Sequence, residues 1–291
     1  MSIAQPAAHA CDHPAPAFRG RIGHDARSGH YAVPRRYRLH LSTADPDGLR
    51  IAVTHGLLRL GAACPVTFLP AVPDCPDGGH ASLRPLYDAS AHRYRGPALA
   101  PVLSDDWSGR IVSTHGPDIA RDLARHFGGG RPSLHPCGTE REAETVVRLC
   151  AEAERSAQLA GDAGVPEPGR ALDDLVRVLD RLEQLLATGP YVTGDHITAA
   201  DVDLWVTLVQ LDTVHRHHLD AAAVQRVAAH DALWSYARRL TAHPAFGTHL
   251  DLDGIDRRHR ARCQGLEAAG SAVQILDWAA YRSEEDRTHQ G

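Results

Sequence analysis

The side chains with the widest range of chemistry in this sequence are its six cysteines and twenty histidines. None of the cysteines belongs to a Cys-x-x-Cys pair; they are Cys11, Cys64, Cys75, Cys137, Cys150 and Cys263. Their spacing predicts neither a zinc site nor a disulfide framework. Lone thiols of this kind are usually small buried apolar residues or inert surface groups. The histidines are scattered along the chain, and their number alone indicates no function.

Three histidines follow a long apolar stretch at helical spacing. His215 and His218 are three residues apart, so both can lie on one face of a helix while His217 points elsewhere. The alternative is that these residues end the helix, where cationic imidazoles suit the negative end of the helix dipole. We favour this second interpretation for His217 and His218.

A carboxylate marks the start of another predicted helix. Asp45 followed by Pro46 suits an N-cap and the first helical position, and we expect the helix to cover 46–60. Alternating residues before it predict a strand over 37–42, and a second strand is expected over 66–70. Strand, helix and strand in this order open a thioredoxin-like domain.

The segment that follows predicts the rest of that domain. Residues 74–90 are rich in Pro, Gly and His and indicate a loop, after which a polar turn separates strands at 100–103 and 110–113. A helix is expected over 118–127. The glycine-rich run 128–132 indicates a linker, where we place the domain boundary.

Helical periodicity dominates beyond the linker, and its centre is a predicted buried helix. Thr198 and Asp201 have the spacing of a capping box at its start. Apolar residues between Val202 and Val214 then recur at spacings of three and four around much of the helix, which is typical of burial on all sides. Further helices are predicted at 140–154, 172–187, 221–227 and 230–240, and an amphipathic piece near the C-terminus (Val273, Leu276, Trp278, Tyr281) is expected to pack back on the body.

Composition excludes several classes of function. A formal charge of -5 and a pI near 6.5 argue against binding nucleic acid or anionic membranes. The apolar runs are too short to span a bilayer, and the N-terminus lacks the features of a signal peptide. We therefore expect a cytoplasmic protein.

A motif at the start of the buried helix carries a family resemblance. The residues Gly194-Asp195-x-Ile197-Thr198-x-Ala200-Asp201 resemble the C-terminal domain signature of glutathione S-transferases. The segment from Gln210 to Leu219 resembles the xi class, the glutathionyl-hydroquinone reductases. The resemblance extends with gaps from about residue 33 to 259.

This resemblance implies an α/β thioredoxin-like N-terminal domain and an all-α C-terminal domain of the glutathione-transferase type. We expect an N-terminal arm over 1–33, the two domains over 34–130 and 131–259, and a tail over 260–291. The family also implies a homodimer.

The catalytic positions differ from the family pattern. The family's Cys-Pro-Trp-Ala motif, whose cysteine is the nucleophile, aligns with Asp45-Pro46-Asp47-Gly48. Aspartate cannot exchange thiols and disulfides, so we expect the cysteine-dependent reductase activity to be absent. Pro101 aligns with the family's cis-proline. The Glu-Ser pair that holds the γ-glutamyl end of glutathione aligns with His115-Gly116, which removes that carboxylate and hydroxyl.

Two tyrosines that flank the family's substrate pocket align with His135 and His215. Asp45 and the three histidines therefore have three interpretations: structural roles only, general acid–base catalysis, or a metal site made of Asp45, His115, His135 and His215.

Our hypothesis is an atypical glutathione-transferase-like enzyme, possessing no catalytic cysteine, that acts on a small organic substrate or thiol adduct in the interdomain cleft, in specialised metabolism. Asp45, His135 and His215 are its catalytic candidates; Pro101, His115 and Gly116 are candidates for binding glutathione or another low-molecular-weight thiol. The alternatives are a non-catalytic ligand-binding protein and a metal-dependent enzyme.

Overall fold

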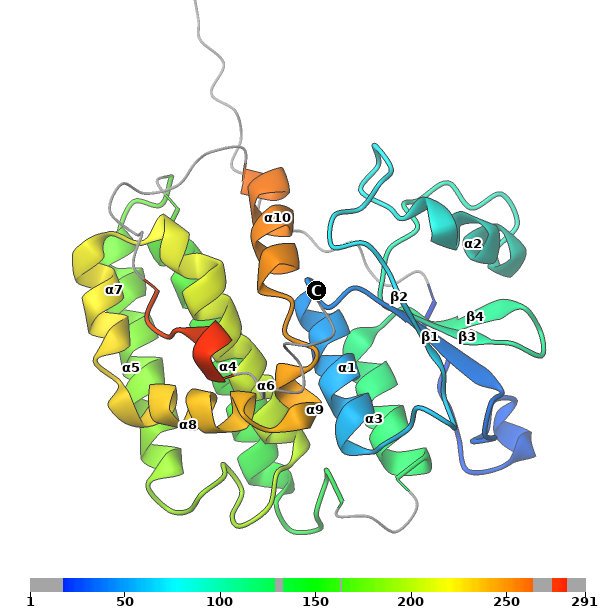
Figure 1. Ribbon diagram of the computed structural model, residues 1–291, viewed down its shortest axis with the longest axis horizontal. Coiled ribbons are helices and arrows are strands. Elements are labelled where there is room, and N and C mark those ends of the chain that lie inside the picture. Colours follow the sequence, from blue (N-terminus) through cyan, green and yellow to red (C-terminus); the bar gives the residue numbers. More distant parts are fainter. Residues whose placement is uncertain (1–17, 129–132, 163, 264–273, 282–291) are drawn as a thin grey trace, which may run out of the picture.

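The computed structural model describes residues 18–128, 133–162, 164–263 and 274–281. A small sheet with helices on both faces lies beside a larger helical bundle (Figure 1). Among the described residues, no helix combines the length and the apolar character needed to cross a bilayer.

The sheet has four strands: β1 (Tyr37–Leu41), β2 (Val66–Phe68), β3 (Val102–Asp105) and β4 (Arg110–Ser113), in the order β2-β1-β3-β4. β1 runs parallel to β2 and antiparallel to β3, and β3 is antiparallel to β4. Leu39 and Leu41 in the central strand are fully buried, as the alternating pattern predicts. All four predicted strands are confirmed.

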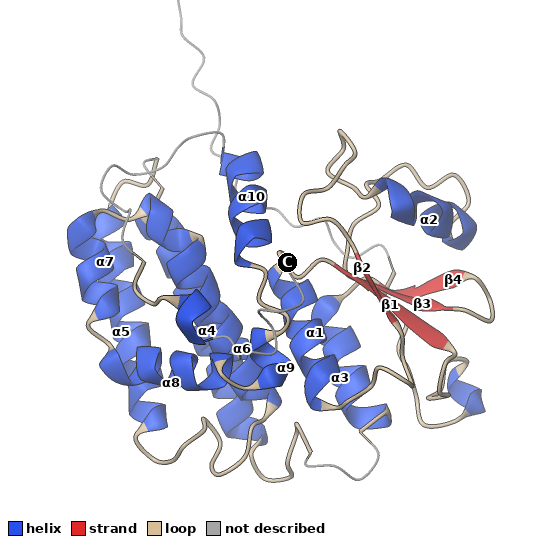
Figure 2. Cartoon of the chain, viewed as in Figure 1, coloured by secondary structure: helices blue, strands red, loops and turns tan. Residues whose placement is uncertain are grey.

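Three helices complete this part of the chain. α1 (Pro46–Leu57) and α3 (Gly116–His126) pack together on the face of the sheet toward the bundle, and α2 (Arg84–Ser90) lies on the other side, near β4 (Figures 1 and 2). The Ala100–Pro101 bond is cis, as expected. This element order confirms the thioredoxin-like domain.

The prediction of a loop over 74–90 is wrong for the second half of that range. A 3₁₀ turn, η2 (Ala81–Leu83), leads directly into α2, with Pro85 in the first turn of that helix. Leu83 and Tyr87, four residues apart, are buried on the same face. This short apolar pair anchors the helix although the surrounding composition is typical of loops.

The bundle consists of α4 (Glu140–Ala160), α5 (Pro168–Leu186), α6 (Ala199–Thr213), α7 (Ala221–Ala228), α8 (Asp231–Thr241), α9 (Pro244–Gly247) and α10 (Leu252–Cys263). α6 is buried along nearly its whole length, and its Trp205 is inaccessible to solvent. The predicted buried helix is therefore confirmed. The bundle core also takes in Ala44, Leu49 and Val53 from the N-terminal half, so the domain limits at 130 and 259 stay a prediction.

Asp201 ties the start of α6 to its surroundings. Its buried carboxylate accepts hydrogen bonds from the Thr198 N–H (2.7 Å) and hydroxyl (2.8 Å), from the Val192 N–H (2.9 Å) and from the Tyr236 hydroxyl (2.6 Å). The expected capping box is present. Because Tyr236 belongs to α8, one carboxylate joins two helices and the loop before α6.

Asp212, near the end of α6, holds the C-terminal segment. It accepts from the N–H groups of Ile275 (2.8 Å) and Leu276 (3.0 Å) and from the Trp278 indole (2.8 Å). Leu276 and Trp278 are buried in the bundle core, which confirms that this piece packs back on the body; Val273 and the Tyr281 side chain lie outside the described residues.

The described part of the N-terminal arm, from residue 18, lies along β4 and α3. The Gly20 N–H donates to the Val112 carbonyl (2.8 Å), and the Asp122 carboxylate accepts from the Ile22 N–H (2.8 Å) and from the Arg21 guanidinium. The arm includes one 3₁₀ turn, η1 (Ala26–Ser28). The arm therefore packs against the sheet-containing part of the molecule.

Candidate functional site

The start of α1 is the centre of the candidate site. Asp45 is the N-cap, and its carboxylate accepts a hydrogen bond from the Gly48 N–H at 3.3 Å. Gly48 packs so closely on the Ser42 carbonyl that any side chain there would overlap it. The predicted cap and the predicted position of Pro46 are both confirmed.

The Asp45 carboxylate also forms an ion pair with a distant helix. Arg258 on α10 lies 2.9 Å from it and donates a further hydrogen bond to the Ala71 carbonyl (3.3 Å). The two side chains are 12% and 18% exposed. α10 lies at the edge of the bundle that faces the sheet-containing part (Figure 1). The pair therefore links the two parts of the molecule where the family has its nucleophile.

His80 is a second polar group close to this pair. The residue is buried. Its backbone N–H donates to the carbonyl of Ala98 (2.9 Å), which lies just before the cis Ala100–Pro101 bond. Burial lowers the pKa of His80, and the positive charge of Arg258 lowers it further. His80 is thus a neutral imidazole at pH 7. Its Nδ1 has no hydrogen-bond partner among the described residues.

Ser42 lies beneath the same helix start. Its carbonyl accepts from the Asp45 N–H (3.1 Å), and its buried hydroxyl makes no hydrogen bond to the part of the chain that the structure describes. Buried polar groups normally have partners, so such atoms call for an explanation.

His115 and Gly116 lie at the start of α3, next to α1. Gly116 packs against the Asp47 carboxylate, which a side chain would displace. The His115 ring is directed to its own helix, with Nδ1 2.9 Å from Asp118. Burial alone would raise the pKa of Asp118, but Arg19, Arg21 and His115 outweigh it and lower that pKa. His115 is thereby held in a local ion-pair cluster.

The other two predicted histidines belong to two further elements of the chain. His135 is exposed in the loop before α4, where its N–H donates to the Ser133 hydroxyl (3.2 Å). His215 begins the 3₁₀ turn η3 (His215–His218) and is half-buried; burial and the neighbouring His218 lower its pKa to about 4. His215 is therefore neutral at pH 7.

The structure does not bring together the four residues of the metal-site interpretation. Among the described residues, the group of three or more His, Cys, Asp or Glu whose ligand atoms lie within 4.8 Å of one another is His218, His259 and Cys263. Asp45, His115, His135 and His215 are not gathered in this way, because Asp45 caps a helix and pairs with Arg258 while His115 faces Asp118.

A half-buried charge cluster lies one turn into α1. The Arg50 guanidinium contacts Asp47 (3.1 Å), Glu154 of α4 (2.9 Å) and Asp203 of α6 (3.2 Å). Burial would lower the pKa of Arg50, but these three carboxylates raise it. Burial raises the pKa of Asp203 to about 6, with Glu154 and Asp47 adding to the effect of burial and Arg50 opposing it. The cluster therefore joins α1 of the sheet-containing part to α4 and α6 of the bundle.

The pKa of Asp203 predicts a pH effect on stability. Between its ordinary value of 3.8 and about 6, the folded protein holds a proton that the unfolded chain has released. Raising the pH through this window should therefore cost stability, by at most about 3 kcal/mol. In urea unfolding across the window, Asp203→Asn should lose less stability than the wild type, whereas the exposed control Asp195→Asn should follow the wild type. Equal pH profiles for Asp203→Asn and the wild type would contradict the assignment.

Comparison with known proteins shows which family this chain resembles. The glutathione S-transferase C-terminal domain model matches residues 151–239. The xi-class transferase from Natrialba magadii has the same fold, with a TM-score of 0.76, 25% sequence identity, and coverage of 92% of this chain and 89% of that one. The chain resembles the glutathione S-transferase superfamily in its C-terminal domain and in its fold. The resemblance seen in the sequence is confirmed.

Two curated relatives that the chain resembles are glutathionyl-hydroquinone reductases. The glutathionyl-hydroquinone reductase PcpF of Sphingobium chlorophenolicum is 28% identical over 81% of this chain and 80% of its own length. The glutathionyl-hydroquinone reductase YqjG of Escherichia coli (strain K12) is 26% identical over 89% of this chain and 84% of its own length. A glutathione-bound structure of YqjG superposes with a TM-score of 0.71 and 23% identity, covering 84% of this chain and 87% of that one.

Proposed function

We propose that this protein is an enzyme that acts on a small organic substrate or thiol adduct at the start of α1 without a cysteine nucleophile. The observation that carries the proposal is the Asp45–Arg258 ion pair at the N-cap of α1. The relatives PcpF and YqjG, which are named as glutathionyl-hydroquinone reductases, support glutathione or a related thiol as the ligand.

The two cysteines that are buried in hydrophobic cores, Cys64 and Cys150, cannot serve as a substitute nucleophile. Cys64 is fully buried beyond the far end of α1, and burial raises its pKa to about 12. Cys150 is buried in the bundle core, and burial likewise raises its pKa to about 12. The thiolate is the reactive form of cysteine, so both thiols are inert at neutral pH.

The groups around Asp45 suit proton transfer and anion binding. Asp45 can accept a proton from a thiol or hydroxyl of the substrate, and the neighbouring N–H groups of α1 favour the anion so formed. Arg258 can bind a carboxylate, and neutral His80 can donate or accept a hydrogen bond. We keep Pro101, His115 and Gly116 as proposed ligand contacts and His135 and His215 as proposed pocket residues. A homodimer and a role in specialised metabolism belong to the same proposal.

Removing either member of the ion pair should weaken ligand binding. A charged hydrogen bond contributes about 1.5–3 kcal/mol, so Arg258→Met should lower the affinity for glutathione or an S-substituted glutathione by about 10- to 100-fold. Once a substrate is found, Asp45→Asn should lower kcat by about 10²- to 10⁴-fold. Titration calorimetry and turnover measurements test this, with Asp88→Asn on the exposed side of α2 as the matched control. Unchanged affinity and kcat in both variants would contradict the proposal.

A non-catalytic ligand-binding protein is the second candidate. It is favoured by the engagement of Asp45 and His115 in contacts within the protein, with Arg258 and Asp118 respectively. Calorimetry separates the two candidates. Ligand binding that depends on Arg258, without turnover of any thiol adduct, supports the binder, whereas turnover that Asp45→Asn abolishes supports the enzyme.

A further inference from the structure

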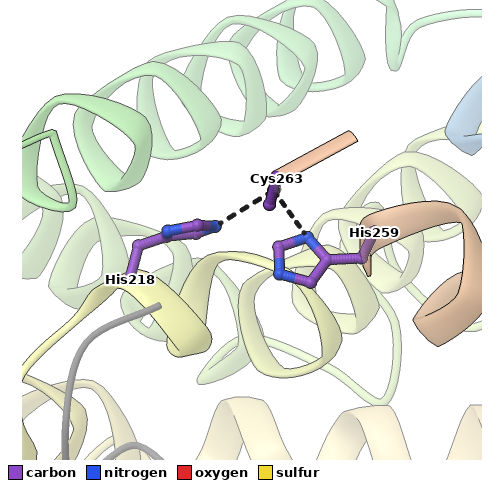
Figure 3. Close-up of side chains that lie close together, drawn as sticks. All are labelled: His218, His259 and Cys263. Carbon is purple, nitrogen blue, oxygen red and sulfur yellow. Dashed lines mark hydrogen bonds between the residues drawn. The ribbon is translucent and has the colours of Figure 1, made fainter. Parts of the chain in front are cut away.

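Three side chains of types that can bind metals lie close together between α10 and η3. His259 and Cys263 are one turn apart on that helix, and His218 comes from η3 (Figure 3). The Cys263 sulfur lies 3.3 Å from His259 Nδ1 and 3.6 Å from His218 Nε2. All three ligand atoms lie within 4.8 Å of one another. This cluster is distinct from Asp45 and from the other residues of the candidate site.

The separations match those of a tetrahedral metal site. A zinc ion bound by sulfur at about 2.3 Å and by nitrogen at about 2.0–2.1 Å holds these two ligands about 3.6 Å apart. The two sulfur–nitrogen distances are 3.6 and 3.3 Å, so each imidazole nitrogen lies about as far from the sulfur as a second ligand of the same zinc ion would. Thiolate and imidazole together favour zinc over magnesium or calcium.

The surrounding structure holds the ligands in place. His259 is 4% exposed, and the His217 ring stacks on it with the centroids 5.1 Å apart. On η3, His218 packs against Gly161 at the end of α4, where an added Cβ would lie 2.5 Å from the His218 Cβ. The absence of a side chain at Gly161 therefore lets η3 approach α4 closely enough to present His218 to α10.

We propose that His218, His259 and Cys263 form a zinc site with three protein ligands, in which water or an external ligand takes the fourth position. Cys263 would bind as the thiolate and release its proton. The metal would join α10 to η3. Arg258, which pairs with Asp45, immediately precedes His259, so zinc would also fix the helix that completes the candidate site.

Cobalt binding tests this site without an assay of activity. The metal-free full-length protein is titrated with Co²⁺, and the thiolate-to-cobalt charge-transfer band and the intense visible bands of tetrahedral cobalt are recorded. We expect these bands to saturate at one cobalt per chain and to disappear when Zn²⁺ is added. Cys263→Ser should abolish the charge-transfer band, and His259→Gln should weaken cobalt binding at least about tenfold. Cys137→Ser, which changes an exposed cysteine, is the matched control and should bind like the wild type.

Two results would overturn the zinc site. One is the absence of the charge-transfer band in the wild type, which would mean that the thiol and imidazoles are only hydrogen-bonded. The other is a band that persists in Cys263→Ser, which would assign the cobalt to another cysteine. Circular dichroism of each variant checks that it is folded. Zinc should also raise the Tm of the wild type and of Cys137→Ser, but not the Tm of Cys263→Ser.

Discussion

Asp201→Ala is expected to lower the free energy of unfolding by about 3–5 kcal/mol, which is a large part of the stability of a typical domain. The substitution leaves four donors from Thr198, Val192 and Tyr236 without their acceptor in a buried place. Each orphaned buried donor costs about 1–3 kcal/mol, and relaxation of the structure reduces the sum. Urea unfolding followed by circular dichroism measures the change.

Two further variants control for this effect. Asp195→Ala removes an exposed carboxylate six residues earlier and should change stability by less than about 0.5 kcal/mol. Tyr236→Phe removes one of the four donors and should cost clearly less than Asp201→Ala. A loss below about 1 kcal/mol for Asp201→Ala would show that Asp201 does not organise the start of α6.

Arg50→Met should also be damaging at neutral pH, at most about 3–5 kcal/mol, because its three carboxylate partners are only half-buried. The substitution leaves Asp47, Glu154 and Asp203 close together without their shared guanidinium. Because protonation relieves this repulsion, the cost should shrink as the pH falls toward about 4. Thermal unfolding of the variant and the wild type over this pH range measures the difference.

An exposed ion pair supplies the control for Arg50. Arg177 pairs with Asp174 on the surface of α5, and Arg177→Met should cost at most about 1 kcal/mol at every pH. If Arg50→Met had the same cost at pH 7 and near pH 4, the loss would come from packing rather than from uncompensated charge.

Local patterns in the sequence predict most of the fold. The Thr198–Asp201 spacing identifies the start of α6, the dense apolar residues after it predict its burial, and Asp45-Pro46 identifies the start of α1. Each of these signals depends on residues within a few positions of one another. α2 was missed because a single apolar pair, Leu83 and Tyr87, anchors it within a segment whose composition is typical of loops.

The candidate site was harder to predict because its contacts are not local. Asp45 is recognisable as a cap, but its partner Arg258 lies 213 positions away, and no local pattern connects the two. His80 was hidden in the segment assigned to a loop. Alignment to the family placed His115 in the pocket, yet the acid three residues later on the same helix holds its ring. His259 and Cys263 have a metal-binding spacing on one helix, but the third ligand comes from another element.

Our central proposal is the replacement of the family's thiol by a carboxylate–guanidinium pair at the start of α1. Its most direct test is to mix the wild type, and separately Asp45→Cys, with a glutathionyl-hydroquinone and to analyse each protein by intact mass and peptide mapping. Attack of a thiolate on the thioether sulfur would join the glutathionyl sulfur to the enzyme as a disulfide and release the hydroquinone. We expect Asp45→Cys to carry one glutathionyl group at position 45, and the wild type to carry none and release no hydroquinone. Release of hydroquinone by the wild type, with a glutathionyl group on one of its own cysteines, would contradict the account.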